Sequence, residues 1–354
     1  MGGATRPRPH RTLLPTDLFA VASGALAGAL ERAIPPACRR GVEAPPAPRL
    51  AGGEALLEFP EWRPRRPSRR FVPSLCLVNG RAAGVRFELS VLAGGAWSPW
   101  VAGAALGDAP FAAAPTRADA LAAEVDEFVA SLPAEAVRVR LRVAAPAPRE
   151  ILAARWLVTL SAWDGAVPAG AVPAARPARL DVPAVSQMEA DAAIRRRLCS
   201  PASVAMVLGY WGVRADLAAL AAEIFHPGLD LYGVWPAAVL AAGRRGLGGY
   251  LLRFPDWAAA AWCLEAGLPI VASVRYGAGE LAGAAIPETP GHLLVLTGHD
   301  GDSVFVNDPA APTAAAAPRR YALGELARVW LERAGVGYVL FRPTTSPSAR
   351  SPRR

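Results

Sequence analysis

The sequence predicts two domains, an all-β sandwich followed by an α+β domain. A chain of 354 residues is long enough for two domains of ordinary size. Short β-prone runs with period-two alternation dominate the first half, whereas helical and strand patterns are mixed beyond about residue 180. The run Gly165–Arg179 between them consists mostly of Ala, Pro and Gly, as in an interdomain linker. The expected division is a loosely ordered leader (1–49), the sandwich (50–165), a linker (166–179), the α+β domain (180–342) and a disordered basic tail (343–354).

The strands of the first half are predicted from alternating hydrophobicity. Apolar residues at 85, 87, 89 and 91 alternate with polar ones, and the pattern recurs over 137–143. Such strands have one buried and one solvated face, and several in succession favour a sandwich. Trp62, Trp97 and Trp100 are assigned to its core, with an aromatic platform that binds a ligand on this domain as the alternative. The predicted strands are Leu56–Trp62, Phe71–Val78, Val85–Leu92, Trp97–Ala105, Ala136–Val143 and Ile151–Ser161.

In the second half, predicted helices come first and predicted strands cluster later. This order is typical of an α+β domain and not of a βαβ alternation. No glycine-rich phosphate-binding loop opens any of the helices. We expect helices at about 201–211, 215–224, 235–245, 256–266 and 323–332, and strands at about 248–253, 269–275, 292–299, 303–307 and 336–342.

The basic charge of the chain does not indicate nucleic-acid binding. The formal net charge is +8, and all the basic residues are arginine because the sequence contains no lysine. The arginines cluster at 63–70, 195–197 and 350–354 without the interleaved aromatic residues of a base-stacking surface. We therefore expect no nucleic-acid partner.

Cysteine and histidine spacings exclude a disulfide framework and a metal site. Cys38, Cys76, Cys199 and Cys263 are widely and irregularly spaced, and the four histidines form no H-E-x-x-H or similar ligand pair. No metal and no organic cofactor are expected.

No apolar run in the sequence is long enough for a membrane-spanning helix. Leu18–Leu30 follows three arginines and weakly resembles a signal peptide, but Asp17 and the lack of a clear cleavage site argue against one. The cellular location, cytoplasmic or extracytoplasmic, stays open.

The stretch Cys199-Ser200-Pro201-Ala202-Ser203 places a cysteine at the start of a short apolar helix. Ser200 is a candidate cap, Pro201 suits the first turn, and Gly212 is expected to end the helix. Val204, Val207, Leu208 and Trp211 recur at helical spacing and predict one buried face. Unpaired N–H groups and the helix dipole favour a thiolate at this position, so Cys199 is a candidate nucleophile. The alternative is a structural core cysteine.

A predicted hairpin supplies the groups that would activate this thiol. His292 opens an apolar strand, and Asp308 follows the strand that returns after the turn at Asp300–Asp302. Simple pairing places His292 beside Asp308, and a histidine oriented by a carboxylate can serve as the base of a cysteine nucleophile. His299 is a rival base, but it lies at the far end of the strand and is expected to be remote from Cys199 and Asp308.

Residues from about 180 to 342 resemble the papain-like cysteine peptidases related to the domains that trim bacteriocin leaders, in their stand-alone branch. The resemblance implies a papain-like fold, with Cys199 as nucleophile, His292 as base, Asp308 as its orienting partner and Gln187 in the oxyanion hole. Ser200 stands where the family often has glycine, and His299 stands where an aromatic residue is common. The resemblance rests on Val182-Pro183, Gln187, Cys199–Ser203, Tyr210-Trp211-Gly212, Tyr232–Trp235, Gly291-His292, Thr297–Asp300 and Val306–Pro309.

The function predicted from these residues is hydrolysis of a peptide bond through a Cys199 thioester, with a peptide or protein as substrate. Two alternatives remain open at this stage. One is acyl transfer to an amine by the same residues, and the other is an inactive binding module in which the β domain carries the function.

Overall fold

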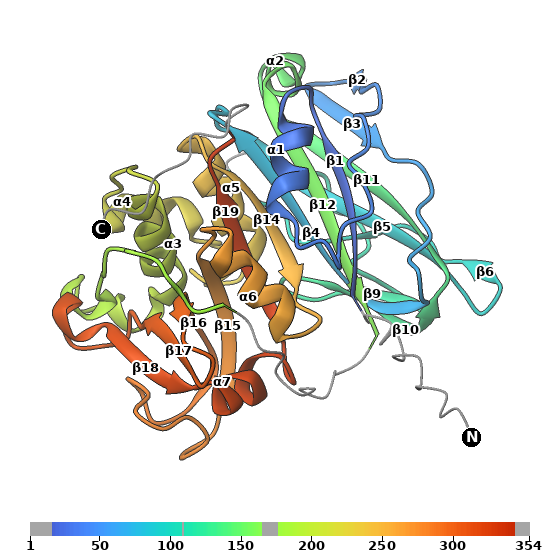
Figure 1. The fold of residues 1–354 in the computed structure, drawn as a ribbon. Helices are drawn as coiled ribbons and strands as arrows, with labels where there is room; N and C mark the ends of the chain where they lie inside the picture. Colours follow the sequence, from blue (N-terminus) through green and yellow to red (C-terminus); the bar gives the residue numbers. More distant parts are fainter. Residues whose placement is uncertain (1–15, 108–109, 165–175, 344–354) are drawn as a thin grey trace, which may run out of the picture.

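The computed structural model describes residues 16–107, 110–164 and 176–343, and Figure 1 shows its arrangement of three antiparallel sheets with helices. Two of the sheets belong to the N-terminal half and the third to the C-terminal half. The chain is thus a mixed α/β protein rich in antiparallel strands.

The first sheet carries the longest strands of the N-terminal half. Its order is β1-β12-β4-β10-β9-β8, and all its pairs are antiparallel. The strands span Thr16–Ala22 (β1), Arg155–Trp163 (β12), Ser68–Val78 (β4), Phe128–Ala134 (β10), Leu121–Ala123 (β9) and Arg117–Ala118 (β8).

The second sheet has the order β2-β3-β11-β5-β6, with β7 also paired to β5. Its longest pair joins β11 and β5 from Ala136↔Leu92 to Ala144↔Gly84, which matches the two runs predicted from alternation. The strands span Arg49–Ala51 (β2), Glu54–Glu58 (β3), Ala136–Ala144 (β11), Gly84–Ala93 (β5), Ala96–Trp97 (β6) and Val101–Ala102 (β7).

The expectation of a loosely ordered leader is wrong for residues 16–49. All seven residues of β1 are buried, and β1 pairs with β12 along its whole length. It is followed by helix α1 (Leu26–Ala33), which buries Leu26 and Leu30. A strand covered on both faces has no alternating pattern, which explains why the apolar run Leu18–Leu30 resembled a signal segment. Residues 1–15 lie outside the described part of the chain.

Two further expectations for the first half need correction. The predicted strand Ile151–Ser161 begins inside helix α2 (Pro148–Ala153), whose first residue is a proline, and only from Arg155 does the chain form β12. Trp62 is buried as expected, but Trp97 and Trp100 are half-buried. Their rings cover the guanidinium groups of Arg138 and Arg140, each at 3.8 Å from the ring centroid.

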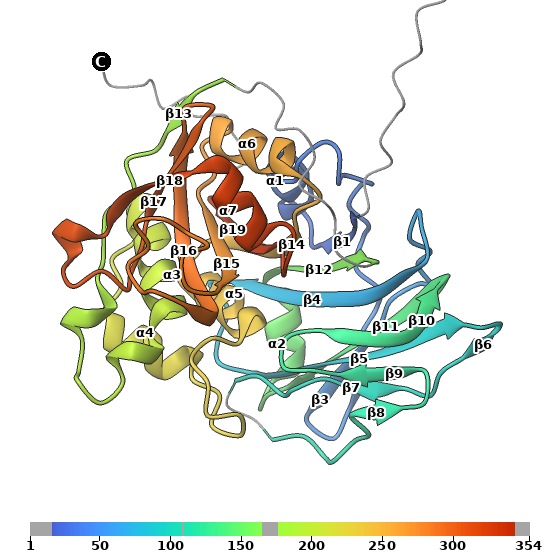
Figure 2. The same cartoon turned by 90° about the horizontal axis from the view of Figure 1, so that it is seen from below.

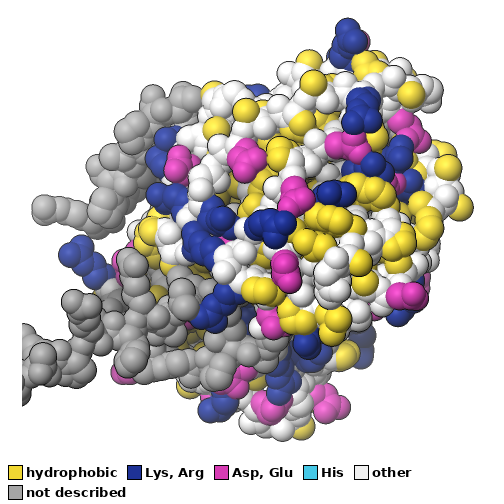
Figure 3. Space-filling view, turned by 90° about the vertical axis from the view of Figure 1, so that its right-hand side faces the viewer, with side chains coloured by type: hydrophobic (Ala, Val, Ile, Leu, Met, Phe, Trp, Pro, Cys, Tyr) yellow, Lys and Arg dark blue, Asp and Glu magenta, His cyan; other side chains and the backbone are white. Residues whose placement is uncertain are grey.

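The outer face of the second sheet is charged rather than apolar. Arg140 and Arg142 of β11 form ion pairs with Glu58 and Glu54 of β3, and Arg142 also contacts Glu88 of β5 at 2.7 Å. Figure 3 faces this side of the molecule, where basic and acidic side chains are interspersed. Opposite charges that face each other on neighbouring strands stabilise the sheet.

The third sheet forms the centre of the C-terminal half. Its order is β14-β19-β15-β16-β17-β18, and β13 (Ala178–Arg179) pairs with β16. The last two residues of the expected linker are therefore a strand, while 165–175 lie outside the described residues. The strands span Gly248–Arg253 (β14), Val336–Phe341 (β19), Ile270–Tyr276 (β15), Thr289–His299 (β16), Ser303–Asn307 (β17) and Pro318–Ala322 (β18).

Helices cover both faces of the third sheet. α3 and α5 pack on one side, and α6 and α7 pack on the other (Figure 2). The five predicted helices are confirmed, with ends that differ by at most two residues from the expected ones. They span Cys199–Tyr210 (α3), Leu217–Ile224 (α4), Trp235–Arg244 (α5), Trp257–Glu265 (α6) and Leu323–Trp330 (α7), and short 3₁₀ turns span Gln187–Glu189, Arg195–Arg197 and Ala314–Ala316.

The two halves of the molecule pack closely against each other. α5 and β14 of the C-terminal half lie against β4, and a Cβ atom added to Gly243 of α5 would lie 2.7 Å from the sulfur of Cys76. The buried apolar residues form one continuous cluster across both halves rather than two separate cores. The division into two domains stays a prediction.

Candidate active site

Helix α3 begins at Cys199, which is half-buried and is the only one of the four cysteines that is not fully buried. Leu198 is the cap residue, and no side chain caps the helix. The expectation that Ser200 caps the first turn is wrong, because Ser200 lies inside the helix and its Oγ is 3.2 Å from the hydroxyl of Tyr338. The first N–H groups of the helix remain free of intrahelical partners.

The body of α3 is more deeply buried than a one-sided pattern predicts. Residues 200–208 are all buried, because β16 and helices α4 and α5 surround the helix. Gly212 has a φ of 76°, and its N–H donates to the Gly209 carbonyl at 2.9 Å, which ends the helix as expected. A helix held on all sides fixes the position of its first residue, Cys199.

The hairpin predicted from the sequence joins β16 and β17 and brings His292 to Asp308. Nε2 of His292 lies 2.8 Å from Oδ1 of Asp308, so the predicted contact is confirmed. Both side chains are buried. Asp308 also accepts hydrogen bonds from the Ala310 N–H at 3.0 Å and from the Tyr321 hydroxyl at 2.9 Å, which hold the carboxylate in one orientation.

The Cys199 thiol interacts with the His292 ring. A side-chain hydrogen bond links Cys199 and His292, and the backbone N–H groups of Ser200 and Leu293 also point at the sulfur. Because Nε2 faces Asp308, Nδ1 is the ring atom left for Cys199.

Electrostatics within this array favour the charged form of each group. Burial acts to raise the pKa of the Cys199 thiol, but the hydrogen bond and charge of His292 outweigh it and lower that pKa. Burial likewise opposes the charged imidazole, but Asp308 raises the pKa of His292 to about 10. The charge of His292 in turn holds the pKa of Asp308 below its usual value despite burial. These interactions thus shift the Cys199–His292 pair toward thiolate and imidazolium.

His299 is not part of this array. Its ring is buried against the edge of Trp257, with centroids 5.7 Å apart, and neither ring nitrogen has a hydrogen-bond partner among the described residues. Burial lowers the pKa of His299, which favours the neutral ring. The structure therefore brings His292, and not His299, to Cys199 and Asp308.

Gln187 lies in the 3₁₀ turn before α3 and is buried. Its backbone N–H donates to the Pro309 carbonyl at 2.8 Å, which ties this turn to the residue after Asp308. One N–H of its side-chain amide donates to the Arg195 carbonyl at 2.8 Å. The amide nitrogen has a second hydrogen, so this contact leaves one donor for another acceptor.

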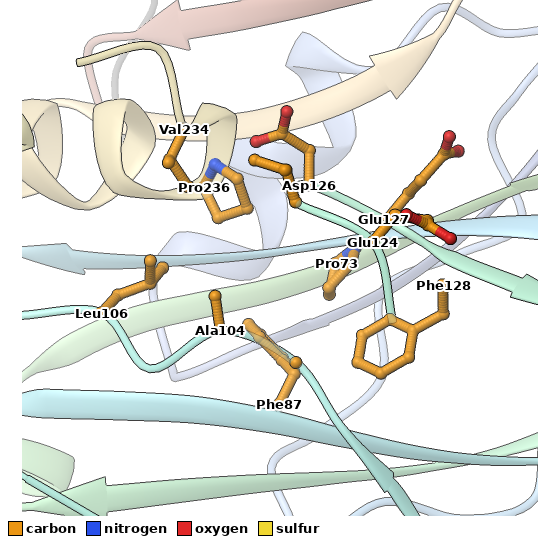
Figure 4. A pocket seen from close by; sticks show the side chains of 12 residues that line it. Pro73, Phe87, Ala104, Leu106, Glu124, Asp126, Glu127, Phe128, Val234 and Pro236 are labelled. Atoms are coloured by element: carbon orange, nitrogen blue, oxygen red, sulfur yellow. The ribbon is translucent and has the colours of Figure 1, made fainter. Parts of the chain in front are cut away.

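Asp126 of the N-terminal half contacts the start of helix α5, a contact that no sequence pattern predicted. Its Oδ1 accepts the backbone N–H of Trp235 at 2.6 Å, at the start of α5. Figure 4 shows the Asp126 side chain directed toward Val234 and Pro236. Burial raises the pKa of Asp126 to about 7.

Within the described residues, no set of three or more histidine, cysteine or acidic side chains has a geometry suited to a metal ion. No helix in the described ranges combines the length and hydropathy that crossing a bilayer requires.

Comparisons with known proteins concern the C-terminal half of the chain. Residues 179–338 match the model of the Peptidase_C39 like family. No curated protein matches the sequence significantly.

Three solved structures are similar to part of the chain. A double glycine motif protease from an AMS/PCAT transporter, solved with its leader peptide, is 20% identical, covers 47% of this chain and 98% of its own, and has a TM-score of 0.33. The peptidase domain of Streptococcus ComA, a bifunctional ABC transporter, is 19% identical, with 45% and 98% coverage and a TM-score of 0.35. A C39-like peptidase from Bacillus anthracis is 18% identical, with 47% and 97% coverage and a TM-score of 0.36.

The matched segment contains Cys199, His292 and Asp308 as well as Gln187. The resemblance to peptidases of the bacteriocin-leader-processing type is thus confirmed: residues 179–338 match the model of the Peptidase_C39 like family.

Proposed function

We propose that the protein is a cysteine peptidase that hydrolyses a peptide bond through a thioester on Cys199. The observation that supports this proposal is the His292–Asp308 hydrogen bond, together with the effect of His292 on the Cys199 thiol, inside the family-matched segment. A lone buried histidine or an isolated cysteine would be weak evidence for catalysis. Their arrangement around one imidazole supports nucleophilic catalysis because it supplies a nucleophile, a base and a group that orients the base.

In the first half of the proposed reaction, the Cys199 thiolate attacks the scissile carbonyl carbon. A C–S bond forms, and the carbonyl π electrons move to oxygen. The oxyanion would accept hydrogen bonds from the Cys199 backbone N–H and the Gln187 amide, and one such donor is worth about 3 kcal/mol of transition-state stabilisation. The C–N bond then breaks as His292 donates its Nδ1 proton to the leaving amine, which leaves an acyl thioester.

In the second half, water replaces the amine. His292, now neutral, accepts a proton from the water as its oxygen attacks the thioester carbonyl. The C–S bond breaks, the carboxylic acid product forms and the thiolate–imidazolium pair is restored. Asp308 stabilises the imidazolium in both halves without itself taking the proton, while Tyr321 and the Ala310 N–H hold its carboxylate.

We also propose a division of the chain into two domains. The C-terminal half would be a papain-like domain, in which the nucleophile begins a buried helix and the base lies on a strand packed against it. The two sheets of the N-terminal half would form a sandwich that supports the substrate side of the site through Asp126.

Hydrolysis and acyl transfer can be separated in one experiment. The full chain is incubated with a proteome-derived peptide library in H₂¹⁸O, with and without glycinamide, and the new C termini are identified by mass spectrometry. Hydrolysis predicts new C termini that carry ¹⁸O in both reactions. Adducts with glycinamide alone would show that the enzyme is an acyltransferase, and the absence of both products would leave the inactive binding module as the correct interpretation.

A further inference from the structure

A cavity of about 400 Å³ lies where the two halves of the molecule meet. Arg70 of β4 and Trp163 of β12, with Glu127 just before β10, line one side of it. Trp235, Arg275 and Arg333 from the C-terminal half line the other side. Its volume lies in the range of sites that hold small molecules or one or two amino-acid side chains.

The cavity is positively charged. Arg70 forms an ion pair with Glu127, and Arg333 pairs with both carboxylate oxygens of Glu280 at 2.7 Å. Arg275 is exposed, and its guanidinium makes no hydrogen bond or ion pair with the described residues. Burial raises the pKa of Glu127, and the positive charge of Arg275 acts in the opposite direction. Arg275 therefore gives the cavity a guanidinium without a bound carboxylate.

Strands β15 and β19 of the third sheet contribute residues to the cavity and also contact the candidate active site. Arg275 follows Val274, which is the residue paired with His292 across β15 and β16. Val336, which also lines the cavity, is two residues before Tyr338 on β19, and the Tyr338 hydroxyl contacts Ser200 next to Cys199. Two residues of a strand span about 7 Å. We take these shared strands as the route by which an extended substrate peptide bound at Cys199 reaches the cavity.

The lining determines which chemical group fits. An arginine guanidinium has a planar set of N–H donors that matches a carboxylate and can bind both of its oxygens. The Trp163 and Trp235 rings offer apolar walls for the methylene groups or backbone that carry such a carboxylate. A cationic side chain would meet three guanidinium groups and would be repelled.

We propose that this cavity binds a carboxylate of the substrate peptide, with Arg275 as its principal partner. This inference rests on the proposed peptidase function, because it assigns the cavity to the same substrate. The N-terminal half then takes part in substrate selection. Its residues Arg70, Glu127 and Trp163 complete the cavity, so both halves of the chain are needed to select an acidic peptide.

Calorimetric titration of the full-length Cys199→Ala variant tests binding separately from the reaction. The probes are a blocked seven-residue peptide with one central Glu, the same peptide with Gln, and the Gln peptide with a free C terminus. Inorganic phosphate is the fourth probe. We expect at least one carboxylate peptide to bind more tightly than the blocked Gln peptide, with an affinity that falls as salt is added. The peptide that binds identifies the source of the carboxylate.

The additional substitution Arg275→Ala is expected to weaken binding of that peptide by about tenfold or more, because a charge-assisted hydrogen-bond pair is lost. Arg149→Ala is the matched control, since Arg149 is an exposed arginine on α2 of the N-terminal half and does not line the cavity. Thermal unfolding of each variant checks that the fold is kept.

Equal binding of the Glu and Gln peptides, binding unaffected by Arg275→Ala, binding of phosphate alone, or binding of none of the probes would each overturn the proposal. If carboxylate binding persists while the wild-type chain cleaves nothing in the library, the proposed function fails and the cavity assignment stands.

Discussion

Replacing Cys199 by alanine is expected to abolish peptide cleavage and to leave the fold intact. The thiolate is the only group in the proposed mechanism that forms a bond to the substrate, so the turnover number should fall by at least about 10⁴-fold. The side chain is small, lies at a helix start and is half-buried, so the free energy of unfolding should change by less than about 1 kcal/mol. Rates on a cleaved library peptide and chemical denaturation measure the two quantities.

Cys263→Ala is the matched control for this substitution. Cys263 is a fully buried cysteine of α6, and burial raises the pKa of its thiol well above the usual value. This variant should lose some stability and keep its activity per folded molecule. A Cys199→Ala protein that still cleaves peptides, or one that unfolds, would count against a nucleophilic Cys199.

Replacing His292 by glutamine is expected to have the second largest effect. Glutamine can still donate a hydrogen bond to the buried Asp308 carboxylate, which limits the loss of stability that an unpaired buried charge would cause. It cannot accept or deliver the proton, so turnover should fall by at least about 10³-fold. His299→Gln, on the same strand but outside the array, should leave turnover per folded molecule unchanged.

The pH dependence of the His292→Gln variant gives an independent readout. In the wild type, His292 opposes the effect of burial and lowers the pKa of Cys199. Without the imidazolium, burial dominates and that pKa should rise, so thiolate forms only at higher pH. The alkylation rate of Cys199 should therefore shift to higher pH in His292→Gln and not in His299→Gln. The opposite pattern would assign the base to His299.

The site could be predicted largely from local sequence because its parts lie in short, regular elements. The turn at Asp300–Asp302 fixes the direction of the hairpin, and strand pairing then brings Asp308 back toward His292. A bulge near Gly298 shifts the pairing of β16 and β17 by one residue. The contact between His292 and Asp308 lies beyond the paired residues and forms despite this shift. Hairpin pairing is a local property, which is why the sequence sufficed.

Features that depend on tertiary packing could not be predicted in this way. β1 was missed because a strand covered on both faces lacks alternation, and β10 was missed because Pro133 interrupts its pattern. Ser200 does not cap the helix as expected. Its hydroxyl instead contacts the hydroxyl of Tyr338, which is distant in the sequence. Asp126 and Trp235 belong to different halves of the chain, so no local sequence pattern could predict their contact.

The most direct test of a catalytic Cys199 is its alkylation rate as a function of pH. The wild-type chain is treated with iodoacetamide between about pH 5 and pH 9, and mass spectrometry gives a rate for each of the four cysteines. We predict that Cys199 alone reacts rapidly at pH 6–7, with an apparent pKa below the ordinary thiol value of about 8.5. Cys38, Cys76 and Cys263 should stay unmodified in the folded protein, because burial raises the pKa of each thiol. Slow and uniform alkylation of all four cysteines would contradict the assignment of Cys199 as an activated nucleophile.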